Sequence, residues 1–118
     1  MARKAPVSVI ETPEFLAATN KLMAEAERML LVDYLAYNPS AGDLIPGTGG
    51  VRKLRWALGG RGKRGGARMI YFYHDADMPL FALTAYAKND RADLSQQDRN
   101  DFKRLTAVLV EAFKRRKT

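Results

Sequence analysis

The sequence contains no cysteine and a single histidine, His74. The absence of cysteine excludes disulfide frameworks, thiolate zinc sites and cysteine nucleophiles. With one histidine in the chain, a serine–histidine triad is almost excluded as well. His74 is followed by Asp75 and Asp77, a pattern that favours a turn over a metal site. We therefore expect neither a bound metal nor another cofactor.

Long hydrophobic runs are missing too. No apolar stretch approaches the roughly 18 residues of a membrane span, and the basic N-terminus leads into no apolar segment typical of a secretory signal. The 118 residues are 47% hydrophobic, which is enough for the core of one ordinary domain. We expect one cytoplasmic domain over residues 1–118, with no membrane partner.

Carboxylates are missing from one segment, Leu44–His74, which also holds eight of the nine glycines. Cations without nearby carboxylates attract polyanions, and glycine allows a backbone to approach a ligand closely. The segment therefore predicts a phosphate-binding surface, although a solvated loop that only confers solubility is the alternative. The charge of this segment, +7, is as large as the net charge of the whole chain. Its seven basic residues are Arg52, Lys53, Arg55, Arg61, Lys63, Arg64 and Arg68.

Helices are predicted near both ends of the chain. The first begins with Thr12 as N-cap, Pro13 in the first helical position and Glu14 in the first turn, and ends before Pro39. It is either one helix or two, with a break near residues 20–24. The last helix begins at Ser95 with a variant capping box and ends in the basic run 114–117.

Strands are predicted between these helices and before them. A short β-branched run at 7–10 suggests an edge strand, and 39–50 is predicted to be a loop. The pattern predicts an antiparallel three-stranded meander formed by residues 51–58, 67–74 and 79–88. Residues 67–74 form its central strand, and 59–66 form a hairpin loop. The expected fold class is therefore α+β, an antiparallel sheet packed against N-terminal helices and a C-terminal helix.

Four basic residues of the meander could meet in one patch. Lys53 and Arg55 share a strand face, Arg68 begins the neighbouring strand, and Lys88 ends the third strand at the same end of the sheet. Salt bridges from this patch to helix carboxylates are the alternative explanation. If the patch binds RNA, the 2′-hydroxyl supplies the nucleophile, fixed guanidiniums can stabilise the phosphorane, and a lysine crowded by cations could act as a base.

Long parts of the chain resemble a known family. The resemblance lies in four strings of the sequence: Gly42–Trp56, Gly62–Tyr71, Tyr86–Asn89 and Asp93–Ser95. These strings resemble the RelE/HigB toxins of bacterial type II toxin–antitoxin modules, which belong to the RelE/ParE superfamily. The resemblance implies a compact toxin fold and a metal-independent, ribosome-dependent endoribonuclease (an mRNA interferase) that cleaves mRNA in the ribosomal A site. It also implies two partners, the ribosome with its mRNA and a cognate antitoxin that often carries a helix-turn-helix DNA-binding domain.

The same resemblance assigns site residues. The lysine and arginine that the family carries on one strand correspond to Lys53 and Arg55. The central-strand arginine of the family corresponds to Arg68, and its basic residue at the end of a strand to Lys88. The resemblance thus makes these four the candidate catalytic residues. The tyrosine that follows in the best-known members is absent, since this region reads Asp93-Leu94. We also expect five residues to contact the RNA backbone: Arg52, Arg61, Lys63, Arg64 and Asn89. Such contacts position the RNA but do not read its sequence.

Two other functions fit the sequence. A ParE-like toxin of the same fold would inhibit gyrase without cutting RNA, and the basic set on the strands argues against it. A non-catalytic nucleic-acid-binding module would show salt-dependent binding and no RNA product. Fold alone does not decide among the three functions.

Overall fold

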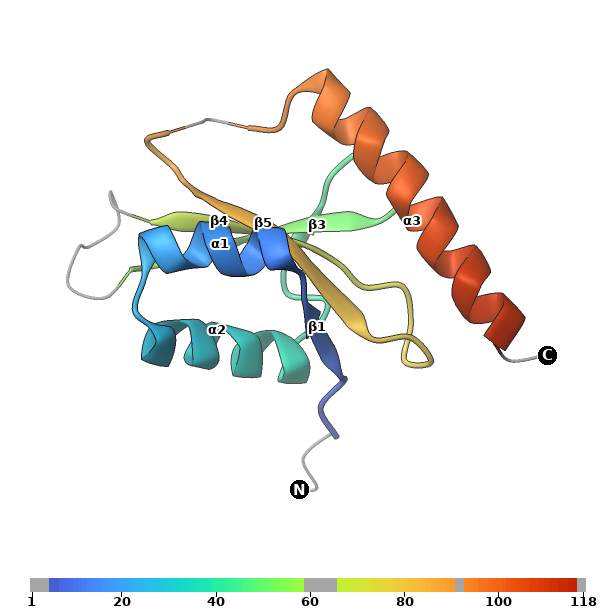
Figure 1. Ribbon diagram of the computed structural model, residues 1–118, viewed down its shortest axis with the longest axis horizontal. Coiled ribbons are helices and arrows are strands. Elements are labelled where there is room, and N and C mark those ends of the chain that lie inside the picture. The colour runs from blue at the N-terminus through green and yellow to red at the C-terminus, as the bar shows by residue number, and fades with distance from the viewer. Residues whose placement is uncertain (1–4, 59–65, 91–92, 117–118) are drawn as a thin grey trace.

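The computed structural model describes residues 5–58, 66–90 and 93–116. Five strands form one sheet in the order β1-β5-β4-β3-β2, with helices before and after the central strands (Figure 1). In these ranges no helix is long and apolar enough to cross a membrane. The elements are β1 (Val9–Glu11), α1 (Pro13–Leu22), α2 (Glu25–Tyr37), β2 (Asp43–Leu44), β3 (Val51–Trp56), β4 (Ala67–Phe72), β5 (Leu80–Ala87) and α3 (Gln96–Arg116).

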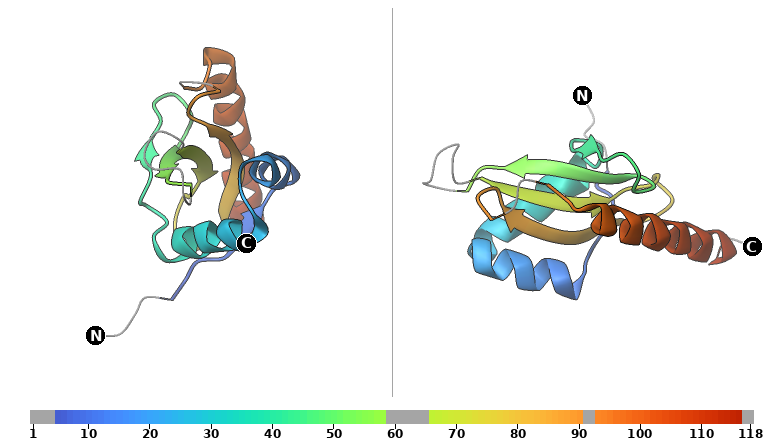
Figure 2. Two further views of the ribbon diagram at one scale, coloured as in Figure 1. Left: turned by 90° about the vertical axis from the view of Figure 1, so that its left-hand side faces the viewer. Right: turned by 90° about the horizontal axis from the view of Figure 1, so that it is seen from above.

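Two hydrophobic clusters lie on the two faces of the sheet, and different helices cover them (Figures 1 and 2). Phe15 of α1 and Leu31 of α2 pack against the face that carries Met69. On the other face, Phe113 of α3 packs against Phe81 with ring centroids 6.1 Å apart. Because β4 is buried on both faces, it forms the centre of the fold.

The predicted α+β class and the antiparallel meander are confirmed, with β4 in the central position. The N-terminal edge strand is confirmed as well, but it runs from 9 to 11 and pairs parallel to β5. The prediction that 39–50 is entirely loop was wrong. Asp43 and Leu44 form β2, which pairs with Lys53 and Arg52 of β3 and closes the other edge of the sheet.

Both predicted helix starts are confirmed. The Thr12 hydroxyl oxygen accepts a hydrogen bond from the Phe15 N–H (3.2 Å), and the hydroxyl also donates to the Ala82 carbonyl of β5 (2.9 Å). Ser95 and Asp98 form a reciprocal capping box, in which each side chain accepts from the other backbone N–H at 3.0 Å. The N-terminal helical region is two helices, α1 and α2, as the predicted break allowed.

The glycine-rich turn at 45–50 has a local structural role. The buried Thr48 hydroxyl donates to the Ile45 carbonyl (2.7 Å) and accepts from the Val51 N–H (3.0 Å), which closes the turn. Gly49 has φ +78°, a conformation that favours glycine. The buried Thr106 hydroxyl of α3 donates to the Thr48 carbonyl (3.1 Å), so α3 is anchored on this turn.

Replacing Gly49 by alanine is expected to lower the free energy of unfolding by about 2 kcal/mol or more. A Cβ there would lie 2.3 Å from the Thr106 Oγ1 and would displace the hydroxyl that holds α3 on the turn. Gly47→Ala is the matched control, because Gly47 has the same φ of +78° but nothing within 4 Å of an added Cβ. Urea unfolding should show a clearly smaller loss for the control, and equal losses would contradict the proposed anchor.

Candidate active site

A polar cavity of about 320 Å³ opens on the face of the sheet that α3 covers. It lies between β2, β3, the start of β4 and the segment that leads into α3. Basic side chains form much of its lining, which is contributed by Asp43, Leu44, Ile45, Pro46, Lys53, Arg55, Arg68, Asp93 and Arg99.

The strand register brings three of the predicted residues into this cavity. Arg55 of β3 pairs directly with Arg68 of β4, so the two side chains share one face on neighbouring strands. Lys53 lies two residues before Arg55 and therefore faces the same way. Leu54, between them, packs into the hydrophobic cluster on the opposite face. The apolar–basic alternation of β3 thus anchors the strand and presents its cations.

Arg55 and Arg68 form no ion pair with any carboxylate in the described parts of the chain. Arg68 Nη1 donates to the carbonyl of Ala67 (3.3 Å), and the Arg55 side chain is exposed. Two neighbouring guanidiniums of like charge repel each other, and a bound anion relieves that repulsion. The pair is therefore suited to bind a phosphodiester or the more highly charged phosphorane.

Lys53 does have an acidic neighbour, Asp93. Its ammonium nitrogen lies 3.4 Å from Asp93 Oδ1, and Arg99 of α3 approaches Asp93 Oδ2 at 3.2 Å. Arg99 also donates to the carbonyl of Pro46 (3.4 Å), which ties the start of α3 to the rim of the cavity. The sequence analysis raised the alternative that the basic patch is held in salt bridges. Among these three residues, that alternative applies to Lys53 but not to Arg55 or Arg68.

The pKa of the Asp93 carboxyl is lowered, first by the hydrogen bond from the Leu94 N–H at 2.8 Å. Desolvation acts in the opposite direction, and the charges of Lys53 and Arg99 lower the pKa further. Asp93 is therefore an ionised carboxylate at neutral pH. It holds Lys53 and Arg99 in place and offsets part of the positive charge of the cavity.

Asp93 is expected to stabilise the folded chain at neutral pH and to lose that effect in acid. Its folded pKa lies below the unfolded value of about 3.9, so its contribution is complete above that value and disappears as the pH falls through the folded pKa. Urea unfolding should show the wild type more stable than Asp93→Asn at neutral pH. The difference should be small, because 45% of the Asp93 side chain is exposed, and it should close below about pH 4. A difference that grows in acid would contradict this assignment.

A comparison with protein-family models identifies the family. The model described as the RelE toxin of the RelE/RelB toxin–antitoxin system matches residues 41–117. The chain belongs to the RelE toxin family. This agrees with the resemblance seen in the sequence, and it places every residue that lines the cavity within the matched range.

Lys88, the fourth candidate catalytic residue of this RelE-family chain, lies just outside the cavity. Its N–H donates to the Gly66 carbonyl (3.1 Å), which places it at the end of the sheet where Arg68 begins β4, as predicted. Tyr86 of β5 pairs with Arg68 and is mostly buried in the hydrophobic cluster beneath α3. The position where the best-known family members carry a tyrosine holds the buried Leu94, which packs in the same cluster.

Of the five predicted RNA-contacting residues, the structure describes Arg52 and Asn89, and neither lines the cavity. Arg52 faces the opposite side of β3 from Lys53, and its guanidinium donates to the carbonyls of Ser40 (3.2 Å) and Gly42 (2.7 Å). Asn89 is exposed in the turn after β5. The remaining three, Arg61, Lys63 and Arg64, lie outside the described residues.

Three charged residues of the cavity, Asp43, Asp93 and Arg99, were not predicted as site residues, and Asp93 and Arg99 pair with each other. In the sequence, Asp93 stands out only as part of the string Asp93–Ser95 that resembles the family, and nothing singles out Arg99. Their spacing carried a usable signal, since a capping box at 95–98 fixes the first turn of α3 and thereby turns Arg99 back toward residue 93. Nothing local, however, indicated that the pair would meet Lys53, which is 40 residues from Asp93.

Proposed function

We propose that this toxin is a ribosome-dependent endoribonuclease that acts in the cytoplasm and cleaves mRNA in the ribosomal A site. Family membership establishes the toxin–antitoxin assignment. The observation that supports RNA cleavage is the Arg55–Arg68 pair, two guanidiniums on adjacent strands with no carboxylate partner among the described residues, at the wall of an open cavity.

The proposed chemistry is attack by a 2′-hydroxyl on the adjacent phosphodiester. The 2′-oxygen forms a bond to phosphorus while the bond from phosphorus to the 5′-oxygen breaks, which leaves a 2′,3′-cyclic phosphate and a free 5′-hydroxyl. The 2′-hydroxyl loses its proton and the 5′-oxygen gains one. Arg55 and Arg68 stabilise the charge that develops on the phosphorane oxygens, a task that fixed cations perform without reorganisation.

Lys53 has a different role in this proposal. Because it is already paired with Asp93, its position is fixed before RNA arrives, and a phosphate that enters the cavity meets a preorganised ammonium. In this proposal Lys88, whose backbone N–H bonds to the Gly66 carbonyl at the end of the same sheet, binds a phosphate of a neighbouring nucleotide rather than the reacting one. Ribosome dependence fits a small site, since the ribosome would hold the mRNA in the bent form that the reaction requires.

Inducible expression followed by mapping of mRNA 5′ ends tests the function. New ends within A-site codons are expected, together with cleavage in translating extracts and none on the same RNA without ribosomes. Intact mRNA in a translating extract would overturn the proposal. Accumulation of gyrase–DNA complexes would support the ParE-like alternative, and salt-dependent RNA binding without product would support a binding module.

A further inference from the structure

Arg99, in the first turn of α3, is held at two points through its guanidinium. Nη2 lies 3.2 Å from Asp93 Oδ2, and Nη1 donates to the Pro46 carbonyl at 3.4 Å. One side chain thus joins two segments that are far apart in the sequence, the one that leads into α3 and the turn that follows β2. The planar fork of arginine fixes the angle between the two bonds, which the single ammonium of a lysine does not do.

Asp93 is the link between Arg99 and Lys53. While Oδ2 faces Arg99, Oδ1 accepts from the Leu94 N–H (2.8 Å) and lies 3.4 Å from Lys53 Nζ. Because a carboxylate is planar and rigid, the bond at Oδ2 limits the direction in which Oδ1 points. Arg99 therefore sets the orientation from which Asp93 holds Lys53.

Arg99 also limits how much of the charge of Lys53 is neutralised. Asp93 carries one negative charge and has these two cations beside it, so it offsets neither of them fully. Without Arg99, Asp93 would act on Lys53 alone, and the ammonium would attract a phosphate less strongly. The arrangement keeps Lys53 in place without cancelling its charge.

We propose that Arg99 is a positioning residue of the active site and that it acts on Lys53 through Asp93. Its effect on the reaction rate rests on the proposed RNA cleavage, whereas its effect on Asp93 can be measured in the protein alone. Because Arg99 belongs to α3, the geometry of the cavity depends on the docking of this helix. The hydrogen bond from the Thr106 hydroxyl to the Thr48 carbonyl holds α3 on the same turn that Arg99 reaches.

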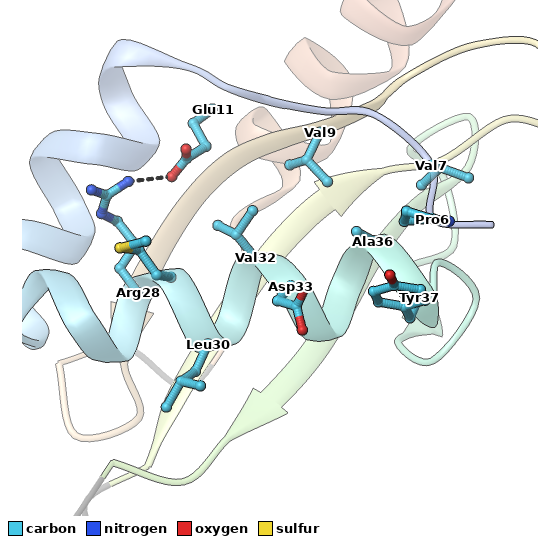
Figure 3. Close-up of a pocket in the computed structure, with 11 residues that line it drawn as sticks. Pro6, Val7, Val9, Glu11, Arg28, Leu30, Val32, Asp33, Ala36 and Tyr37 are labelled. Carbon is cyan, nitrogen blue, oxygen red and sulfur yellow. Dashed lines mark hydrogen bonds and ion pairs between the residues drawn. The ribbon is translucent and has the colours of Figure 1, made fainter. Parts of the chain in front are cut away.

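Arg28 of α2 provides a matched comparison on the other face of the sheet. It pairs with Glu11 of β1, beside a groove of about 640 Å³ between β1 and α2 (Figure 3), and its Nη2 lies 3.6 Å from Glu25 Oε1. The Arg28 side chain is 20% exposed, against 25% for Arg99. Neither of these two carboxylates lines the basic cavity. Arg28→Ala therefore removes a half-buried guanidinium and its ion pairs without touching the site.

Titration of the Asp93 carboxyl by ¹³C NMR tests the inference in the purified chain. The hydrogen bond from the Leu94 N–H is the main cause of the lowered pKa of Asp93, and it remains in Arg99→Ala. The charge of Arg99 also lowers this pKa, so its loss should raise the pKa of Asp93, whereas Arg28→Ala should leave it unchanged. The other charged side chains of the cavity are the same in both variants: Asp43, Lys53, Arg55 and Arg68. An Asp93 pKa that does not rise in Arg99→Ala would overturn the proposal, whether or not the chain cleaves RNA.

Single-turnover cleavage in a translating extract tests the effect on the rate. Arg99→Ala is expected to lower the rate constant by about 10- to 100-fold, as for a group that is slightly misplaced, with little change in affinity for the ribosome. Arg99→Lys keeps the charge but not the fork, and it should recover little of the loss. Arg28→Ala should be close to wild type. Full recovery in Arg99→Lys, or an equal loss in a folded Arg28→Ala protein, would overturn the positioning role.

A double-mutant cycle shows whether Arg99 acts through Asp93. Arg99→Ala should cost little further in a chain that already carries Asp93→Asn. An equal cost in both backgrounds would mean that Arg99 acts on the RNA directly, which would overturn the proposal. If the wild type itself leaves mRNA intact, the proposed function fails, and the pKa of Asp93 alone decides whether Arg99 orients this carboxylate.

Discussion

Replacing Arg68 by alanine is expected to lower the rate of mRNA cleavage by about 10²–10³-fold and to abolish growth inhibition. Arg68 pairs with Arg55 across the β3–β4 ladder, and the two are the cavity-lining guanidiniums that have no carboxylate partner among the described residues. Its loss removes stabilisation of the phosphorane, which exists only in the transition state. The rate constant should therefore fall, while the affinity for the ribosome changes little. Single-turnover cleavage in a translating extract measures the effect.

Two further variants separate catalysis from folding and from net charge. Arg68→Lys keeps the charge but loses the bidentate geometry, and it should retain only part of the activity. Arg104→Ala removes one exposed cation from α3 and should be close to wild type. Urea unfolding of all three variants shows whether the chain is intact. Full activity in a well-folded Arg68→Ala protein would remove Arg68 from the mechanism.

Changing Lys53 and Arg55 together to alanine is expected to reduce cleavage by at least about 10³-fold. The pair supplies the β3 side of the cavity, and only Arg68 and Arg99 of its basic lining would remain. The double change removes two positive charges from the cavity. Asp93 keeps Arg99 as a partner but loses Lys53, so the cavity becomes less positive than after a single change. Mapping of mRNA 5′ ends after induction should show no new ends above background.

A double variant of equal charge is the control for this experiment. Lys103 and Arg104 are both exposed on α3, and neither lines the cavity. Lys103→Ala with Arg104→Ala should retain most of the cleavage, since general attraction to the ribosome is reduced equally in the two double variants. Equal losses would mean that the basic residues act only through net charge, which would favour a binding module over an enzyme.

Local chemistry explains why much of the fold was predictable from the sequence. The caps at Thr12 and Ser95 are formed by residues within three positions of each other, so the helix starts do not depend on the rest of the chain. The alternation in β3 likewise places Lys53 and Arg55 on one face. That alternation also places Arg52 on the other face, where its guanidinium donates to the Gly42 carbonyl, and the RNA contact of Arg52 stays a prediction.

The edges of the sheet were predicted less well than its centre. β2 is only two residues long, and its pairing with β3 depends on the turn that Thr48 closes rather than on β propensity. β1 pairs parallel with β5, from which two helices and three strands separate it along the chain, so its direction depends on a long-range pairing. Elements this short carry too little pattern to be recognised from their own residues.

The sequence by itself determined the class of fold, the helix starts and a strand with cations on one face, because each of these follows from residues that are neighbours along the chain. Only the tertiary structure decided which side chains meet those cations. Asp93 reaches Lys53, Arg99 returns to the cavity, and β1 opens a groove at the far edge, because packing of α3 and α2 on opposite faces brings distant segments together. Electrostatic balance at this site is a property of that packing, because Lys53 and Asp93, which meet there, are 40 residues apart in the chain.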